Sequence, residues 1–105
     1  TRLRYGELRI QAYAARSTVY RAAHLADSGA NVVNESIAAK AFASETLGRT
    51  VDTAIQIVGG GALMTNHPLA TLYRQARSLR VAEGLTDVLN ANIARGALDL
   101  NMGTL

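Results

Sequence analysis

The sequence predicts an all-α fold, specifically an antiparallel four-helix bundle, and three observations lead to this prediction. Hydrophobic residues make up 49% of the 105 residues, which is enough for one domain with a modest core. Apolar residues recur at steps of three and four, as on one face of a helix, and no segment alternates as a strand does. Glycine and the single proline fall between the periodic segments, where helices end and begin.

Four periodic segments are present, and they predict helices over residues 2–28, 34–58, 68–79 and 87–98. Gly29 follows the first segment, where a residue in a left-handed conformation commonly ends a helix. Pro68 begins the third segment, because the first turn of a helix does not need its missing N–H. We expect Asn31 or Asn34 to cap the second helix and Thr86 to cap the fourth.

The second segment has a regular apolar stripe at steps of four and three, made of Ile37, Ala41, Ser44, Gly48, Val51, Ile55 and Val58. Ser44 and Gly48 are small, so a neighbouring helix is expected to approach closely there. Short connections between the segments favour antiparallel neighbours.

Composition excludes several kinds of site. There is no cysteine, so disulfides, thiolate metal sites and a cysteine nucleophile are absent. His24 and His67 have no second ligand at a suitable spacing, and no metal site is predicted. The net charge of +3 is dispersed, which argues against a nucleic-acid partner. No apolar run reaches 18 residues, so no membrane span is predicted, and we expect a cytoplasmic protein.

Three local features have both structural and functional interpretations. Gly59-Gly60-Gly61 lacks the lysine of a phosphate loop and reads, taken alone, as a helix stop. Arg74, Arg77 and Arg80 recur every three residues and predict a solvated or ion-paired helix face. Glu83 lies among apolar neighbours at a break between helices. Burial would raise its pKa and make it a usable base, although most turn glutamates are solvated.

Four linked stretches of sequence favour the functional interpretation of these features. They are AARSTVYRAAHLADSG (14–29), AAKAFASETLGRTVDTAIQIVGGGAL (38–63), HPLATLYRQAR (67–77) and RVAEGLTDVLNANIAR (80–95). Together they resemble the C-terminal helical domain of the acyl-CoA dehydrogenases, and the resemblance covers nearly the whole chain.

The resemblance implies a fold and an activity. In that family a four-helix bundle follows an N-terminal helical domain and a middle β-domain, and FAD lies between the β-domain and the bundle. The enzymes oxidise acyl-CoA thioesters to trans-2-enoyl-CoA and pass electrons to an electron-transferring flavoprotein. We therefore expect an FAD-dependent enzyme that forms a homo-oligomer, a dimer or a tetramer. Residues 1–105 would be its C-terminal bundle without the first helix, and would be inactive and flavin-free alone.

The resemblance also assigns cofactor residues. Gln56, Gly59 and Gly60 match the Q-x-x-G-G stretch that lines the adenosine–pyrophosphate part of a flavin belonging to the partner subunit. Two residues without a Cβ would let the backbone approach that cofactor closely.

The resemblance also assigns residues that act on or contact the substrate. Glu83 matches the catalytic carboxylate of the family's E-G-T motif, which removes the α-proton of the thioester while a hydride leaves Cβ for the flavin. Gly84 would let the substrate come close to this base. Leu85 occupies the position of the threonine beside the flavin.

The chain departs from the family pattern at Ala62, Leu63, Gln75 and Leu85, where a glycine, an aromatic residue, an aspartate and a threonine are usual. Two alternatives therefore stay open. One is a divergent subunit of an unequal flavoenzyme pair, and the other is a non-catalytic helical oligomerisation module.

Overall fold

The computed structural model describes all 105 residues and contains helices but no strand. The helices are α1 (Arg2–Asp27), α2 (Val33–Val58), the short 3-10 helix η1 (Gly60–Leu63), α3 (Pro68–Leu79) and α4 (Thr86–Leu98). The all-α class and the four predicted helices are confirmed, and each predicted boundary lies within one residue of the observed one. The short helix η1 was not predicted, because the three glycines hide its local pattern.

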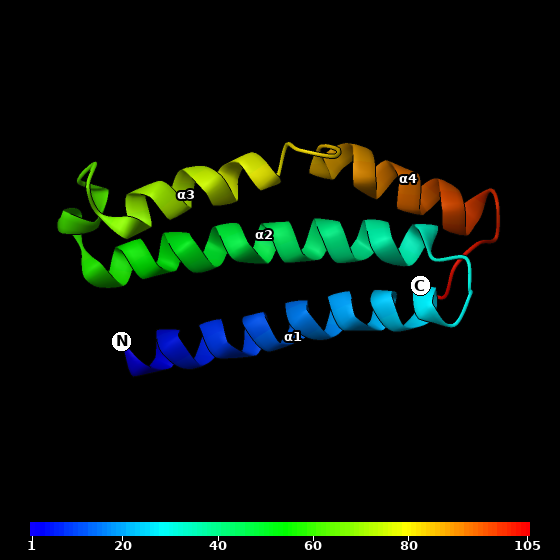
Figure 1. Ribbon diagram of the computed structural model, residues 1–105, viewed down its shortest axis with the longest axis horizontal. Coiled ribbons are helices and arrows are strands. Elements are labelled where there is room, and N and C mark those ends of the chain that lie inside the picture. The colour runs from blue at the N-terminus through cyan, green and yellow to red at the C-terminus, as the bar shows by residue number, and fades with distance from the viewer.

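Helix α2 is the centre of the molecule, with α1 on one side and α3 and α4 on the other (Figure 1). Every pair of α-helices that packs together includes α2, and α1 touches neither α3 nor α4. Helices α3 and α4 lie end to end and run in the same direction, antiparallel to α2 (Figure 1). Their 12 and 13 residues total 25, close to the 26 residues of α2, so the two short helices together cover its length.

The core is built mainly from small side chains. Its buried apolar residues are Ala22, Ala39, Ala41, Val51, Ala62, Ala70, Ala76 and Leu89. Alanine lets helix axes approach, but at Gly48 the neighbour is a long side chain and not a helix backbone. A Cβ at Gly48 would lie 3.4 Å from Cδ of Arg80, which follows α3.

Helix ends agree with the prediction where glycine and proline set them, and agree only in part where side-chain caps were predicted. Gly29 has φ +82° just after α1, and Pro68 begins α3. Asn31 Oδ1 accepts a hydrogen bond from the backbone N–H of Val33, at the start of α2. Of the two candidates for the start of α2, Asn31 therefore makes this contact and Asn34 does not, and the prediction that Thr86 caps α4 is wrong. Asn34 and Thr86 both lie inside helices, and each donates a hydrogen bond to a segment far away in sequence.

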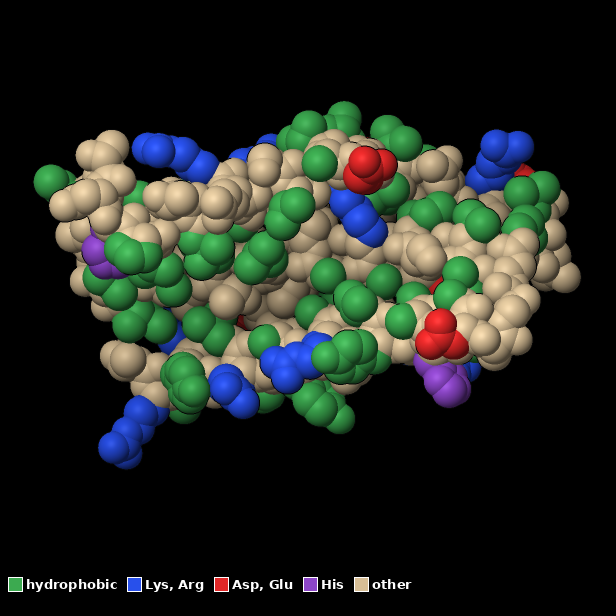
Figure 2. All heavy atoms as spheres, in the orientation of Figure 1, with side chains coloured by type: hydrophobic (Ala, Val, Ile, Leu, Met, Phe, Trp, Pro, Cys, Tyr) green, Lys and Arg blue, Asp and Glu red, His purple; other side chains and the backbone are tan.

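The outer face of α1 carries exposed apolar side chains. Leu3 and Tyr13 are 90% and 73% exposed, and Ile10 and Tyr20 are also largely exposed. Figure 2 shows such apolar side chains interspersed with cations along its lower edge, where α1 runs. No helix is long and apolar enough to cross a membrane.

Candidate functional site

The turn between α3 and α4 places Glu83 at the surface in an unusual backbone conformation. Glu83 has φ +58° and Gly84 has φ +115°. A Cβ at Gly84 would lie 3.0 Å from Cδ2 of Leu89, which is buried. Glycine is therefore needed at position 84 on two grounds, the left-handed φ and the close approach to Leu89.

The sequence places Glu83 among apolar neighbours, but the structure does not bury its side chain. Its side chain is exposed, and it makes no hydrogen bond or ion pair within this chain. The bundle itself therefore supplies no burial for this carboxylate. Its assignment as a catalytic base stays a prediction, because any further enclosure would come from groups outside these 105 residues.

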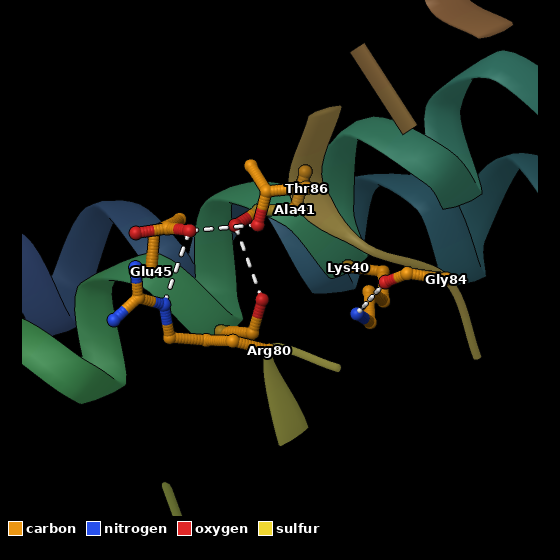
Figure 3. Close-up of polar contacts among 7 residues, drawn as sticks. Lys40, Ala41, Glu45, Arg80, Gly84 and Thr86 are labelled. Carbon is orange, nitrogen blue, oxygen red and sulfur yellow. Dashed lines mark hydrogen bonds and ion pairs between the residues drawn. The ribbon is translucent and has the colours of Figure 1, made fainter. Parts of the chain in front are cut away.

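Lys40, the only lysine, connects α2 to this turn. Its Nζ donates a hydrogen bond of 2.8 Å to the carbonyl oxygen of Gly84, the residue after Glu83 (Figure 3). Lys40 is half-buried, so its aliphatic part packs against the bundle while its ammonium group reaches the turn.

Glu45, on α2, holds both ends of the same turn. Its Oε1 accepts a hydrogen bond of 2.7 Å from the Thr86 hydroxyl and one of 3.1 Å from Arg80 Nε, which is also an ion pair (Figure 3). The Thr86 hydroxyl and the Arg80 guanidinium stabilise the charged form, so the pKa of Glu45 lies below its ordinary value despite desolvation. Glu45 is therefore an ionised anchor at neutral pH.

Sequence reasoning missed the contributions of Lys40, Glu45 and Thr86. The contacts join residues 35 to 44 positions apart, so no local pattern reveals them. A usable signal was present in Lys40, a single lysine within an apolar helical stretch. Arg80 was predicted to be solvated or ion-paired, and its ion pair with Glu45 is observed.

The predicted flavin residues lie at the C-terminal end of α2, whereas the Glu83 turn is attached nearer its middle, at Lys40 and Glu45. Gln56 is exposed, and Gly59 has φ +91° just after the helix. At Gly59 and Gly60 a Cβ would meet no atom within 4 Å, so the backbone there is open to approach. Lys40 and Gln56 are separated by 16 residues of α2, or about 24 Å along its axis. A single chain therefore does not bring these residues together with Glu83.

Leu85 stands beside Glu83 and Gly84 and is half exposed, so it offers apolar surface next to the carboxylate. Metal binding finds no support in the structure. No group of three His, Cys, Asp or Glu side chains is arranged to hold an ion. His67 instead caps α3, since its Nδ1 accepts a hydrogen bond of 3.1 Å from the N–H of Leu69.

Residues 1–98 match the family model described as acyl-CoA dehydrogenase, C-terminal domain. The chain belongs to the acyl-CoA dehydrogenase family. This confirms the resemblance on which the site assignments were based, and the four helices are those of the family's C-terminal helical domain.

Individual relatives agree with this assignment. The chain is 34% identical over 89 residues to an acyl-CoA dehydrogenase of Bacillus subtilis, covering 85% of the chain and 24% of that protein. It is 38% identical over 82 residues to an acryloyl-CoA reductase (NADH) of Anaerotignum propionicum, covering 78% of the chain and 21% of that protein. A solved chain from work on the electron transferring flavoprotein of Acidaminococcus fermentans superposes with a TM-score of 0.87. The two chains are 28% identical, over 92% of this chain and 26% of that one. The chain thus spans about a quarter or less of the length of these relatives.

Proposed function

We propose that residues 1–105 form the C-terminal helical-bundle domain of an FAD-dependent acyl-CoA dehydrogenase. The parent enzyme would oxidise an acyl-CoA thioester to the trans-2-enoyl-CoA, with Glu83 as the base. The observation that carries this proposal is the exposed Glu83-Gly84 turn, held in a left-handed conformation within a domain of this family.

The chemistry asked of Glu83 is proton removal. The α-hydrogen of a thioester is weakly acidic, so a carboxylate poised beside it can accept the proton as the β-hydrogen leaves as hydride. Glu83 projects from the bundle at an exposed turn, where substrate can reach it. Gly84 has no side chain to block that approach, and the apolar surface of Leu85 adjoins it.

The residues present fit a flavin at the C-terminal end of α2. The open backbone at Gly59 and Gly60, together with the exposed amide of Gln56, suits the adenosine–pyrophosphate part of FAD. When bound, FAD supplies the hydride acceptor. Gln56 lies 11 residues along α2 from Glu45 and 16 from Lys40, the two residues that hold the Glu83 turn, or roughly 16–24 Å along the helix axis. This separation supports the inference that one subunit contributes Glu83 while its partner contributes Gln56, Gly59 and Gly60 to the same cofactor.

That arrangement requires a homo-oligomer, a dimer or a tetramer. We propose an electron-transferring flavoprotein as the electron acceptor. Similarity to a solved chain from work on such a flavoprotein supports this choice.

One relative favours a second candidate, the reverse reaction. The relative from Anaerotignum propionicum is named an acryloyl-CoA reductase. In that direction Glu83, protonated, would deliver its proton to Cα of an enoyl-CoA while Cβ receives the hydride. The same carboxylate serves both directions, because the group that removes the α-proton during oxidation returns it as an acid during reduction.

The test is anaerobic stopped-flow reduction of the full-length enzyme by a series of acyl-CoA thioesters. Glu83→Gln keeps the shape of the side chain and should retain FAD, but should lower the rate of flavin reduction at least ~10²-fold. Glu83→Asp should keep part of the activity, because a carboxylate remains but is set back by one methylene. Oxidation of the dithionite-reduced enzyme by enoyl-CoA measures the reverse direction.

Three outcomes count against the proposal. Wild-type reduction rates in Glu83→Gln would remove Glu83 from the mechanism. A full-length protein that binds no FAD would favour the helical oligomerisation module. Flavin that no acyl-CoA reduces and no enoyl-CoA reoxidises would favour a divergent subunit of an unequal pair.

A further inference from the structure

We infer that Lys40 and Glu45 are positioning residues for Glu83, a role that rests on the proposed function. Both lie on α2, five positions apart, which is about 7.5 Å along the helix axis. From there they hold the α3–α4 turn at Arg80, Gly84 and Thr86 (Figure 3). These three points of attachment lie on both sides of Glu83 in the sequence.

The turn has few other restraints. The last backbone hydrogen bond at its start runs from the Ala82 N–H to the Ser78 carbonyl, and the next begins at the Leu85 carbonyl, which accepts from the Leu89 N–H. Between these two bonds the peptide groups of Glu83 and Gly84 make no backbone–backbone hydrogen bond. The Lys40 ammonium is therefore the only hydrogen-bond partner of the Gly84 carbonyl.

The backbone conformation of Glu83 is an unfavourable one. A non-glycine residue at φ +58° is strained relative to an ordinary turn conformation, so Glu83 keeps this φ only if its surroundings enforce it. Lys40 holds the peptide group between Gly84 and Leu85 through its hydrogen bond to the Gly84 carbonyl. Glu45 holds the residues at the two ends of the turn, Arg80 and Thr86, because its Oε1 accepts a hydrogen bond from each. Releasing either contact lets the turn relax, and the backbone at Glu83 then loses its fixed conformation.

The variant that tests this is Lys40→Met in the full-length flavoenzyme, since methionine keeps the length of lysine and removes the donor. We expect an intact flavin content and a nearly unchanged apparent affinity for acyl-CoA, with a rate of flavin reduction at least about tenfold lower. Lys40→Arg keeps a cationic donor and should recover most of the rate. Thr86→Val removes the hydroxyl at the other end of the turn, keeps the side-chain shape, and should show the same pattern. It tests the proposal independently if Lys40→Met fails to fold.

A double variant separates positioning from general stability. If Lys40 acts through Glu83, then adding Lys40→Met to Glu83→Gln should slow flavin reduction no further, because the group being positioned is already disabled. Arg74→Met is the matched control. It removes one exposed cation from α3 that makes no hydrogen bond or ion pair, and it should behave like wild type.

The outcomes of the two proposals are distinguishable. Slow reduction in Glu83→Gln combined with wild-type rates in Lys40→Met and Thr86→Val would overturn the positioning role and leave the proposed function standing. Multiplicative losses in the double variant would also overturn it, as would an equal loss in Arg74→Met. Wild-type rates in Glu83→Gln would instead refute the proposed function itself.

Discussion

One carboxylate oxygen of Glu35 accepts two hydrogen bonds from Thr104, which lies 69 positions away. The Thr104 backbone N–H lies 2.6 Å from Glu35 Oε1, and the Thr104 hydroxyl lies 2.9 Å from it. This contact fastens the C-terminal tail to the start of α2, beside α1. The other oxygen of Glu35 is buried without a partner, so the contact depends on Oε1 alone.

This contact predicts a pH dependence of stability. Hydrogen bonds from backbone N–H groups, its own first and then that of Thr104, hold the pKa of Glu35 below its ordinary value of 4.5, against the effect of desolvation. A lowered folded-state pKa means that the stabilisation is fully present above about pH 4.5. It is lost as pH falls through the folded-state pKa. Glu45 has a lowered pKa too and contributes with the same sign.

Urea denaturation between pH 7 and pH 3 measures this effect. The free energy of unfolding should decline below about pH 4.5, and Glu35→Gln, which keeps Oε1 as an acceptor, should flatten the decline. Thr104→Val should cost about 1 kcal/mol at pH 7 by removing one hydrogen bond to the carboxylate. An unchanged pH profile in Glu35→Gln would show that Glu35 is not the titrating group.

A second prediction concerns Gly96, which is buried in α4 against α2. A Cβ at Gly96 would overlap the side-chain amide of Asn34. That amide is buried and donates a hydrogen bond of 2.9 Å to the Met102 carbonyl, so it cannot move without losing this bond. Gly96→Ala should therefore lower the free energy of unfolding by about 1–3 kcal/mol, the usual cost of overpacking.

Gly6→Ala is the matched control. Gly6 lies inside α1, and a Cβ there meets nothing within 4 Å, so alanine should stabilise by roughly 0.5–1 kcal/mol through helix propensity. Adding Asn34→Ala to Gly96→Ala should recover part of the loss, because the clashing amide is removed. Equal effects of Gly96→Ala and Gly6→Ala would contradict the packing account.

A third prediction separates fold from cofactor binding at Gly60. A Cβ at this position meets no atom of the chain, and its φ is not in the left-handed region, so Gly60→Ala should leave the melting temperature nearly unchanged. In the full-length enzyme it should weaken FAD binding about tenfold, or about 1.4 kcal/mol, because the methyl group occupies space that the cofactor needs. Gly59→Ala is a less clean test, since φ +91° adds strain. Wild-type FAD affinity in Gly60→Ala would remove this glycine from the flavin site.

The fourth prediction is self-association of the 105-residue chain. Leu3, Ile10, Tyr13 and Tyr20 expose apolar surface on α1 that no other helix covers, and surfaces of this kind are usually covered by another chain. Light scattering at about 100 μM, a concentration that reveals weak association, should detect species larger than the monomer. Ile10→Glu combined with Tyr13→Glu should shift the population toward monomer. A strictly monomeric wild-type chain under these conditions would refute the prediction.

The four helices and most of their ends follow from local sequence patterns. Apolar spacing of three and four residues is a property of neighbours on one helix, and glycine or proline acts on its own backbone, so both can be read locally. Gly29, Gly59 and Pro68 therefore marked the ends of helices correctly. The linked stretches around Gln56 and Glu83 were sufficient to assign the family.

How these helices position the site residues depends on contacts between segments far apart in the sequence. Asn34 and Thr86 have side chains suited to capping, yet each donates to a distant partner, because the packed helices bring Met102 and Glu45 within hydrogen-bond distance. The same packing brings Lys40 to Gly84, which lies 44 residues further along the chain. It also places α3 and α4 end to end along α2. Contacts at such separations depend on the path of the whole chain, whereas helix formation depends on residues within one or two turns.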